Sequence, residues 1–335
     1  MNLVPIAAIA LAPALMFLLA LVYLDSYKLT SLRVVLAVLG AGAAMAALAY
    51  LCNGALIRVT GLDIVAYSRT VAPLVEETLK ALIVVALFRT HRVGFHIDAA
   101  ILGFAAGAGF GVVENAAYMA MTPGANAGTW IVRGLGTALM HGAVTAIVAV
   151  TALMVHDSRS RASPLAYVAC LLFGVVLHAV FNQFFLSPLL STVLTILVLP
   201  PLLLEILTHG QRRVARWLGA GFDADAQMLE LLDSGNFRDS PMGRYLQSLG
   251  DRFSGPVVAD ILCYVRLNLE LALRAKGLLM MRETGFDVPV DEETKGKFTE
   301  IDYLESSIGT TGLLAVRPML HLSREDLWQM NLLGH

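Results

Sequence analysis

The chain has 335 residues, of which 57% are hydrophobic and 15% are charged, and its mean hydropathy is +0.70. Soluble domains carry about 25% charged residues, so this composition excludes an ordinary soluble protein. The net charge of −2 says nothing about nucleic acid, but the sequence has no basic patch with interleaved aromatic residues, so no nucleic-acid partner is expected. Three scattered cysteines provide neither a disulfide framework nor a zinc knuckle.

The apolar residues are concentrated in positions 1–209, in seven segments long enough to cross a lipid bilayer, which takes about 20 apolar residues. No basic residue precedes the first segment, as it would in a cleaved signal peptide, so we expect this segment to stay in the membrane. The sequence therefore predicts an all-α fold, a polytopic membrane helix bundle of about seven transmembrane helices. The seven segments cover residues 3–24, 34–57, 70–88, 97–121, 131–155, 165–186 and 189–208.

Basic residues are distributed unequally between the two sides of this predicted bundle. Nine Lys and Arg residues lie in the first, third and fifth loops and at the start of the tail, against three on the other side. The positive-inside rule then predicts an N-terminus outside and a cytoplasmic C-terminal tail. The tail, residues 210–335, is polar with helical periodicity, notably over 256–282, so we expect a helical cytosolic domain with a regulatory role.

Several ionisable side chains interrupt the apolar segments, at a cost of about 2.5–3.5 kcal/mol each near the centre of a membrane helix. A rise of about 1.5 Å per residue places them roughly 10–16 Å below the outer face, on four segments that run in alternating directions. Randomly scattered polar residues would instead fill the hydrocarbon thickness of about 30 Å. We therefore predict an intramembrane active site. Its residues are Glu76, Glu77, Lys80, Glu114, His141 and His178.

Spacing within two of these segments brings polar side chains onto one helix face. Lys80 follows Glu76 by four residues and Glu77 by three, so its ammonium group can reach either carboxylate. Asn182 follows His178 by one helical turn, where it can orient the imidazole or donate to a substrate. We therefore predict a supporting role for Lys80 and a catalytic role for Asn182.

The segment 97–121 carries Glu114 together with features that suit helix packing. Asn115 can anchor this helix to another part of the bundle. Gly103, Gly107 and Gly111 are four residues apart, a spacing that lets two helix backbones approach closely. The glycines are thus predicted to dock the helix that delivers Glu114.

These motifs resemble those of the PrsW-type intramembrane proteases, in the superfamily that includes CAAX prenyl proteases and abortive-infection membrane proteins. Segment 75–80, V-E-E-T-L-K, is similar to the family's E-E-x-x-K motif, and segment 109–115, G-F-G-V-V-E-N, to its G-F-x-x-x-E-N segment. His141 and H-A-V-F-N at 178–182 complete a resemblance that covers 70–186. It implies cleavage of a single-span membrane protein, such as an anti-sigma factor, near the outer side of a bacterial cytoplasmic membrane.

Peptide hydrolysis requires an activated water molecule, a polarised carbonyl group and a proton for the leaving amine. In one arrangement, Glu114, His141 and His178 bind a zinc ion. Glu76 or Glu77 is then the general base. In the other arrangement no metal is bound, a glutamate activates water directly, and His178 with its neighbouring asparagine stabilises the oxyanion. The chain lacks the H-E-x-x-H motif of common zinc peptidases.

Two other functions fit part of this pattern. Ionisable residues in membranes also form the proton relays of coupled transporters. Transporters often contain inverted repeats or helices broken at the midplane, whereas this chain has no clear internal repeat and its polar groups gather on one side of the midplane. A non-catalytic scaffold that recruits partners through its tail would not need the complete set of acidic and imidazole groups. The protease is therefore favoured, and no oligomeric state is predicted.

Overall fold

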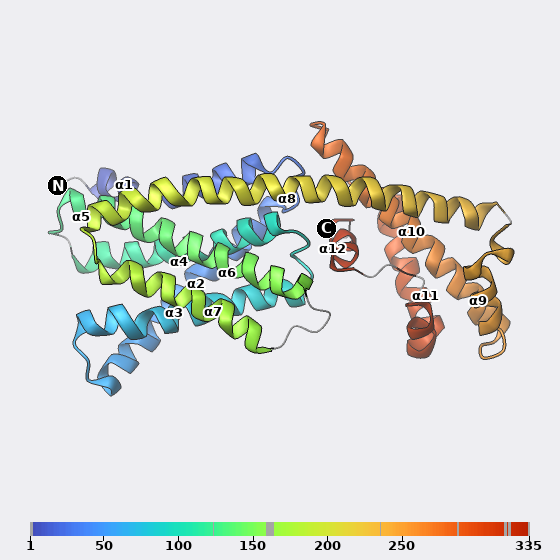
Figure 1. Cartoon of the computed structure of the whole chain (residues 1–335), viewed down its shortest axis with the longest axis horizontal. Helices are drawn as coiled ribbons and strands as arrows, with labels where there is room; N and C mark the ends of the chain where they lie inside the picture. The colour runs from blue at the N-terminus through green and yellow to red at the C-terminus, as the bar shows by residue number, and fades with distance from the viewer. Residues whose placement is uncertain are drawn as a thin grey trace. The chain divides into compact units, whose positions relative to one another are not determined.

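The computed structural model is helical throughout the residues it describes, with no strand among them (Figure 1). The predicted all-α fold is therefore confirmed. Two compact units divide the chain: unit 1 comprises residues 1–25 and 30–211, and unit 2 comprises residues 26–29 and 212–335. The described residues are 3–122, 124–158, 164–234, 236–286, 288–317, 320 and 323–333.

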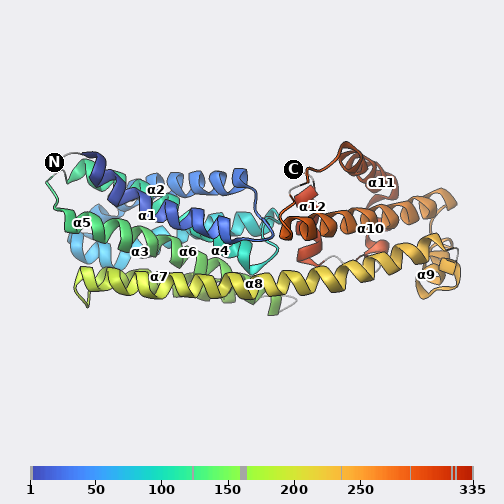
Figure 2. The ribbon, with the colours of Figure 1, turned by 90° about the horizontal axis from the view of Figure 1, so that it is seen from above.

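Unit 1 is a bundle of long helices that lie alongside one another in both ribbon views (Figures 1 and 2). Each of the seven predicted apolar segments forms such a helix. A short π-helix, η1, separates α5 from α6. The elements are α1 (Leu3–Leu24), α2 (Leu32–Thr60), α3 (Ile64–Arg89), α4 (His96–Met121), α5 (Ala127–Ile131), η1 (Val132–Thr137), α6 (Ala138–Ser158), α7 (Pro164–Gln183) and α8 (Pro188–Asp233).

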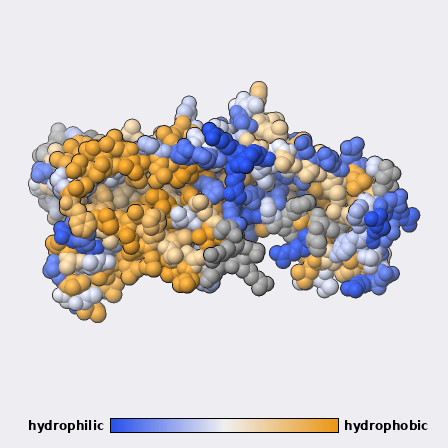
Figure 3. Space-filling view, viewed as in Figure 1, coloured by the Kyte–Doolittle hydropathy of each residue, from blue (hydrophilic) through white to orange (hydrophobic). Residues whose placement is uncertain are grey.

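Among the described residues, six stretches of helix are long and apolar enough to cross a membrane: α1, α2, α4, α5 to α6, α7 and α8. The helix α3 has 26 residues but is not among them, since Glu76, Glu77 and Lys80 occupy its middle. Apolar residues cover most of the visible face of unit 1 (Figure 3), as expected for a surface that meets lipid. Unit 1 is therefore a membrane helix bundle.

The helices α4 and α6 form the buried centre of unit 1. Of the most apolar stretch in each candidate span, 83% is buried in α4 and 78% is buried in α5 to α6. In each of the other candidate spans at most 28% of that stretch is buried. Small residues allow this packing: a Cβ atom on Gly107 would lie 2.1 Å from the carbonyl oxygen of His141, and one on Gly103 would lie 2.8 Å from Cα of Ala146. The predicted glycine ladder thus brings the backbones of α4 and α6 into direct contact.

The helix α8 extends well beyond the predicted segment 189–208. It continues for 46 residues to Asp233 and has no proline after Pro201, so nothing in its covalent structure interrupts the backbone hydrogen bonds at position 209. The predicted border between membrane bundle and tail therefore lies inside a continuous helix.

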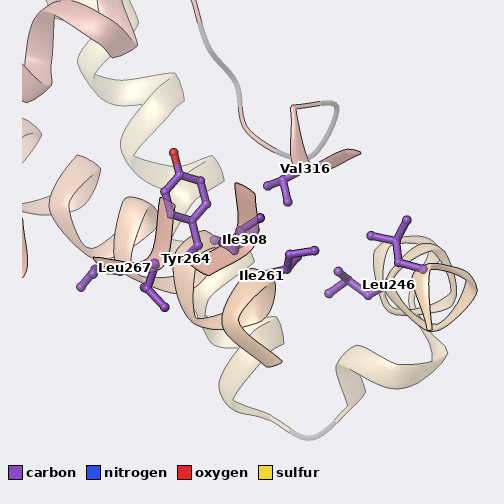
Figure 4. Packing of buried hydrophobic residues seen from close by; sticks show 9 residues of the cluster. Leu246, Ile261, Tyr264, Leu267, Ile308 and Val316 are labelled. Carbon is purple, nitrogen blue, oxygen red and sulfur yellow. The ribbon is translucent and has the colours of Figure 1, made fainter. Parts of the chain in front are cut away.

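Unit 2 contains the second part of α8 and a set of helices packed around a separate apolar core. Figure 4 shows part of this core, in which Ile261 and Tyr264 of α10 face Ile308 of α11. The predicted helical stretch 256–282 lies within α10. These elements are η2 (Asn236–Asp239), α9 (Pro241–Leu249), α10 (Gly255–Glu283), α11 (Glu292–Val316) and α12 (Arg324–Leu333).

A short segment far away in the sequence also belongs to unit 2. Residues 26–29 connect α1 and α2, and Tyr27 among them is only 2% exposed. Arg282 at the end of α10 donates a hydrogen bond to the carbonyl oxygen of Lys28 at 3.4 Å. Burial, with a hydrogen bond to Glu283, raises the pKa of the Tyr27 hydroxyl well above its usual value. The first loop is thus part of the packing of unit 2.

Candidate active site

The helix α3 brings an acid pair and a lysine into the buried interior of unit 1. Glu77 and Lys80 form an ion pair over one helical turn, and their side chains are 1% and 0% exposed. Oε1 of Glu77 also lies 2.8 Å from Nδ1 of His178 on α7. The sequence spacing allowed Lys80 to reach either Glu76 or Glu77. The fold pairs it with Glu77 and adds the histidine to the same oxygen atom.

His141 on α6 connects this pair to α4. Its Nδ1 atom lies 3.0 Å from Nζ of Lys80, and its Nε2 atom lies 2.7 Å from Oε2 of Glu114. The rings of His141 and His178 are in edge-to-face contact, with 4.8 Å between their centroids. Five predicted site residues from α3, α4, α6 and α7 are therefore linked through direct contacts.

Glu76 lies on the other side of His178. Its Oε2 atom is 3.8 Å from Nε2 of His178, and its Oε1 atom accepts a hydrogen bond from Nδ2 of Asn53 at 3.2 Å. Tyr67 in turn donates from its hydroxyl group to Oδ1 of Asn53 at 2.9 Å. Sequence reasoning did not select Asn53 or Tyr67. The isolated amide of Asn53 in the apolar segment 34–57 was a signal that could have pointed to it.

Glu114 is held by an arginine near the start of the predicted segment 131–155. Nη2 of Arg133, in η1, lies 3.0 Å from Oε1 of Glu114, and Nε of Arg133 donates to Oδ1 of Asn115 at 2.9 Å. Asn115 donates from Nδ2 to the carbonyl oxygen of Ala10 at 2.8 Å, which ties α4 to α1. Arg133 is thus a site residue that sequence reasoning missed, because it was counted only as a charge at the membrane surface.

Asn182, for which the sequence predicts a catalytic role, bonds to the backbone at the start of α3. Its Nδ2 atom donates to the carbonyl oxygen of Ser68 at 3.0 Å, and the neighbouring Gln183 donates to the carbonyl oxygen of Arg69 at 3.4 Å. In this structure, therefore, both amides fasten the end of α7 to the start of α3. An oxyanion role for Asn182 would use the second hydrogen of its amide group.

Among the described residues, one group of side chains is close enough to share a metal ion. Glu76, His141 and His178 each offer one ligand atom, and these atoms lie within 4.8 Å of one another. Ligands held at about 2.0–2.2 Å around one tetrahedral ion lie roughly 3.4 Å apart, which is near the 3.8 Å between Nε2 of His178 and Oε2 of Glu76. One carboxylate with two imidazoles suits zinc and related divalent metals. Nε2 of His178 faces Glu76, whereas the ring nitrogens of His141 contact Lys80 and Glu114, so His141 would exchange one of these contacts for such an ion.

This group differs from the predicted ligand set in its carboxylate. Sequence reasoning grouped Glu114 with His141 and His178 from their similar predicted depth and from the two-histidine, one-glutamate ligand set of soluble zinc peptidases. Depth along a helix does not determine the direction in which a side chain points around the helix axis. In the folded chain Glu76 faces the free nitrogen of His178, whereas Glu114 lies against His141 and Arg133.

Three carboxylates and two imidazoles thus gather inside an apolar helix bundle, and these are side chains that a membrane-embedded hydrolytic enzyme would use. A family model of PrsW family intramembrane metalloproteases matches residues 30–206, which is more than half of the chain. The chain belongs to this family and is therefore an intramembrane endopeptidase, as its motifs predicted. The match includes every site residue described above. Comparisons with curated proteins and with solved structures return no match.

Proposed function

We propose that this chain cleaves a peptide bond in a single-span membrane protein, near the outer face of a bacterial cytoplasmic membrane. The convergence of Glu76, His141 and His178 from α3, α6 and α7 at one point of an apolar bundle carries this proposal. Family membership supports the reaction class. The resemblance described above favours a regulator of the anti-sigma-factor type as the substrate.

The contacts of Glu76 and Glu77 favour different roles for the two carboxylates. Glu77 is almost fully buried, and its Oε1 atom already accepts from Lys80 and His178. In this position it orients His178 so that Nε2 faces Glu76, as carboxylates behind metal-bound histidines commonly do. Glu76 has a 12% exposed side chain and faces the same space as His178. Glu76, rather than Glu77, is therefore the carboxylate that meets the reacting groups.

We assign the metal site to Glu76, His141 and His178, and zinc is the ion that this donor set and the family description favour. A bound zinc ion would polarise the scissile carbonyl group and make a water molecule acidic. The side chain of Glu114 is 27% exposed, the most of the three carboxylates. In this arrangement Glu114 accepts the proton of the attacking water and returns it to the leaving amine.

Two alternative assignments keep the same residues. If Glu114 is the metal ligand, Glu76 becomes the general base. If no metal is bound, Glu76 activates water directly, and His178 donates from Nε2 to the oxyanion once that nitrogen carries a proton. All three assignments require Glu76, which makes this residue the critical position for a test.

The orientation and the tail complete the proposal. The excess of basic residues in the first, third and fifth loops supports an N-terminus on the outer side of the membrane and a tail, residues 210–335, in the cytoplasm. Glu76, Glu114 and His178 then lie in the outer half of the membrane. The tail forms a helical core of its own in unit 2, which supports a separate domain, and we assign the regulatory role to this domain.

The experiment uses the full chain in lipid vesicles together with a panel of single-span reporter proteins. The wild type is expected to release fragments, whereas Glu76→Gln and His178→Ala are expected to release none while remaining inserted. Glu205→Gln is the matched control, because Glu205 lies on α8 with a 66% exposed side chain whose carboxylate is 2.8 Å from Nδ1 of His209, outside the candidate site. Equal cleavage by the wild type and both site variants would contradict the proposal.

A further inference from the structure

Arg133 lies in a local distortion of the helix that leads into α6. Residues 132–137 form a π-helical turn, in which Ala138 donates its backbone N–H to the carbonyl oxygen of Arg133. Such turns are rare and frequently mark functional sites. This one is tightly packed, since a Cβ atom on Gly134 would lie 1.9 Å from the carbonyl oxygen of Ile9. The turn therefore holds Arg133 at a defined position.

The guanidinium group of Arg133 is fixed on three sides. It contacts Oε1 of Glu114, donates from Nε to Asn115, and has its Cζ atom 3.5 Å from the centre of the Tyr118 ring. Asn115 donates back to the carbonyl oxygen of Arg133 at 3.1 Å. The side chain of Arg133 is only 12% exposed. Few other orientations of this side chain are compatible with these contacts.

Glu114 connects the guanidinium group of Arg133 to the imidazole ring of His141. Its Oε1 atom is 3.0 Å from Arg133, and its Oε2 atom is 2.7 Å from Nε2 of His141. A carboxylate in apolar surroundings is costly unless it is paired. Without Arg133, Glu114 would lose one of its two partners and would be free to rotate towards water.

We propose that Arg133 is a positioning residue of this protease, which acts through Glu114 to hold the ring of His141 in its working orientation. The proposal rests on the site assignment above. Arg133 does not need to touch the substrate, so its removal should slow the chemical step without weakening substrate binding. Mutation of a residue that orients a metal ligand through a hydrogen bond typically lowers activity or metal affinity by about 10–100-fold.

The test compares Arg133→Ala and Arg133→Lys with the wild type in lipid vesicles. Arg58→Ala is the matched control, since Arg58 is an exposed arginine at the end of α2. We expect kcat of Arg133→Ala to fall by about 10–100-fold with KM unchanged. Arg133→Lys should keep only part of the wild-type activity, because one ammonium group cannot replace the planar guanidinium group in its contacts with both Glu114 and Asn115. Added guanidinium ion should restore part of the activity of Arg133→Ala but none of that of Glu114→Gln.

A second readout does not depend on catalysis. In competition with a chelator, Arg133→Ala should hold Zn²⁺ about 10–100-fold more weakly than the wild type, and Arg58→Ala should hold it equally well. The inference is overturned if Arg133→Ala keeps the wild-type kcat. The inference is also overturned if added guanidinium restores none of the activity of Arg133→Ala and this variant binds zinc as tightly as the wild type. If the wild type cleaves no reporter, the proposed function fails, and the zinc competition still decides the role of Arg133.

Discussion

Nδ1 of His178 lies 2.8 Å from Oε1 of Glu77, although 101 positions separate the two residues in the chain. This contact joins the middle of α3 to the C-terminal part of α7. Oε1 of Glu77 also accepts a hydrogen bond from the ammonium group of Lys80. One oxygen atom therefore neutralises a buried charge and orients the imidazole ring of His178. The stability of the bundle and the geometry of its active site therefore depend on the same carboxylate.

Glu77→Gln is expected to impair both properties. An amide cannot neutralise Lys80, and an unpaired buried charge destabilises by about 3–5 kcal/mol. The double variant Glu77→Gln/Lys80→Met removes that charge and should recover most of the stability, but not the cleavage activity, if Glu77 orients His178. Unfolding in mixed detergents and reporter cleavage measure the two effects. A double variant with restored activity would show that Glu77 serves only the ion pair.

Metal content should separate the roles of two carboxylates. Glu76→Gln is expected to lose bound metal, because Glu76 belongs to the three-residue group with converging ligand atoms. Glu114→Gln should retain the metal and lose cleavage activity, as a general base would. Elemental analysis of both purified variants measures this directly. The reverse result would assign Glu114 as the ligand and Glu76 as the base.

Removal of metal should stop cleavage reversibly. Treatment of the wild type with a strong chelator is expected to abolish reporter cleavage, and zinc should restore it while the protein stays folded. Circular dichroism before and after treatment provides the control for unfolding. Full activity in protein that contains no stoichiometric metal would instead establish the metal-free arrangement.

The hydrogen-bonded chain from Tyr67 through Asn53 to Glu76 should tune the site modestly. Tyr67→Phe removes one neutral hydrogen bond, worth about 1 kcal/mol. If that energy holds Glu76 in place, kcat should fall roughly fivefold. Asn53→Leu removes the side chain that donates directly to Glu76, so it should lower kcat further than Tyr67→Phe does. Steady-state cleavage of a reporter measures both changes, and a larger effect of Tyr67→Phe than of Asn53→Leu would contradict this order.

Close packing between α4 and α6 should tolerate no side chain at Gly107. In Gly107→Ala, the added Cβ would lie 2.1 Å from the carbonyl oxygen of His141, so the backbones must separate. Loss of cleavage and of folded protein is expected. Gly40→Ala on α2 is the control, because nothing lies within 4 Å of its added Cβ and alanine favours a helix by roughly 0.5–1 kcal/mol. Equal behaviour of the two variants would argue against the packing described here.

The sequence by itself determined which segments form long helices and which ionisable residues these helices carry. Apolar content and the rise along a helix are properties of position along the chain, so Glu76, Glu77, Glu114, His141 and His178 were all recognisable. The contact of Glu77 with Lys80 was also predictable, since both lie on neighbouring turns of one helix.

Only the tertiary structure decided which of these groups meet. The rotation of each helix about its axis directs Glu76, instead of Glu114, towards the free nitrogen of His178. A π-helical turn brings Arg133 from the expected membrane surface to Glu114, and close packing of α2 on α3 brings Asn53 to Glu76. These outcomes depend on contacts between distant segments, whose energies the local sequence pattern does not contain.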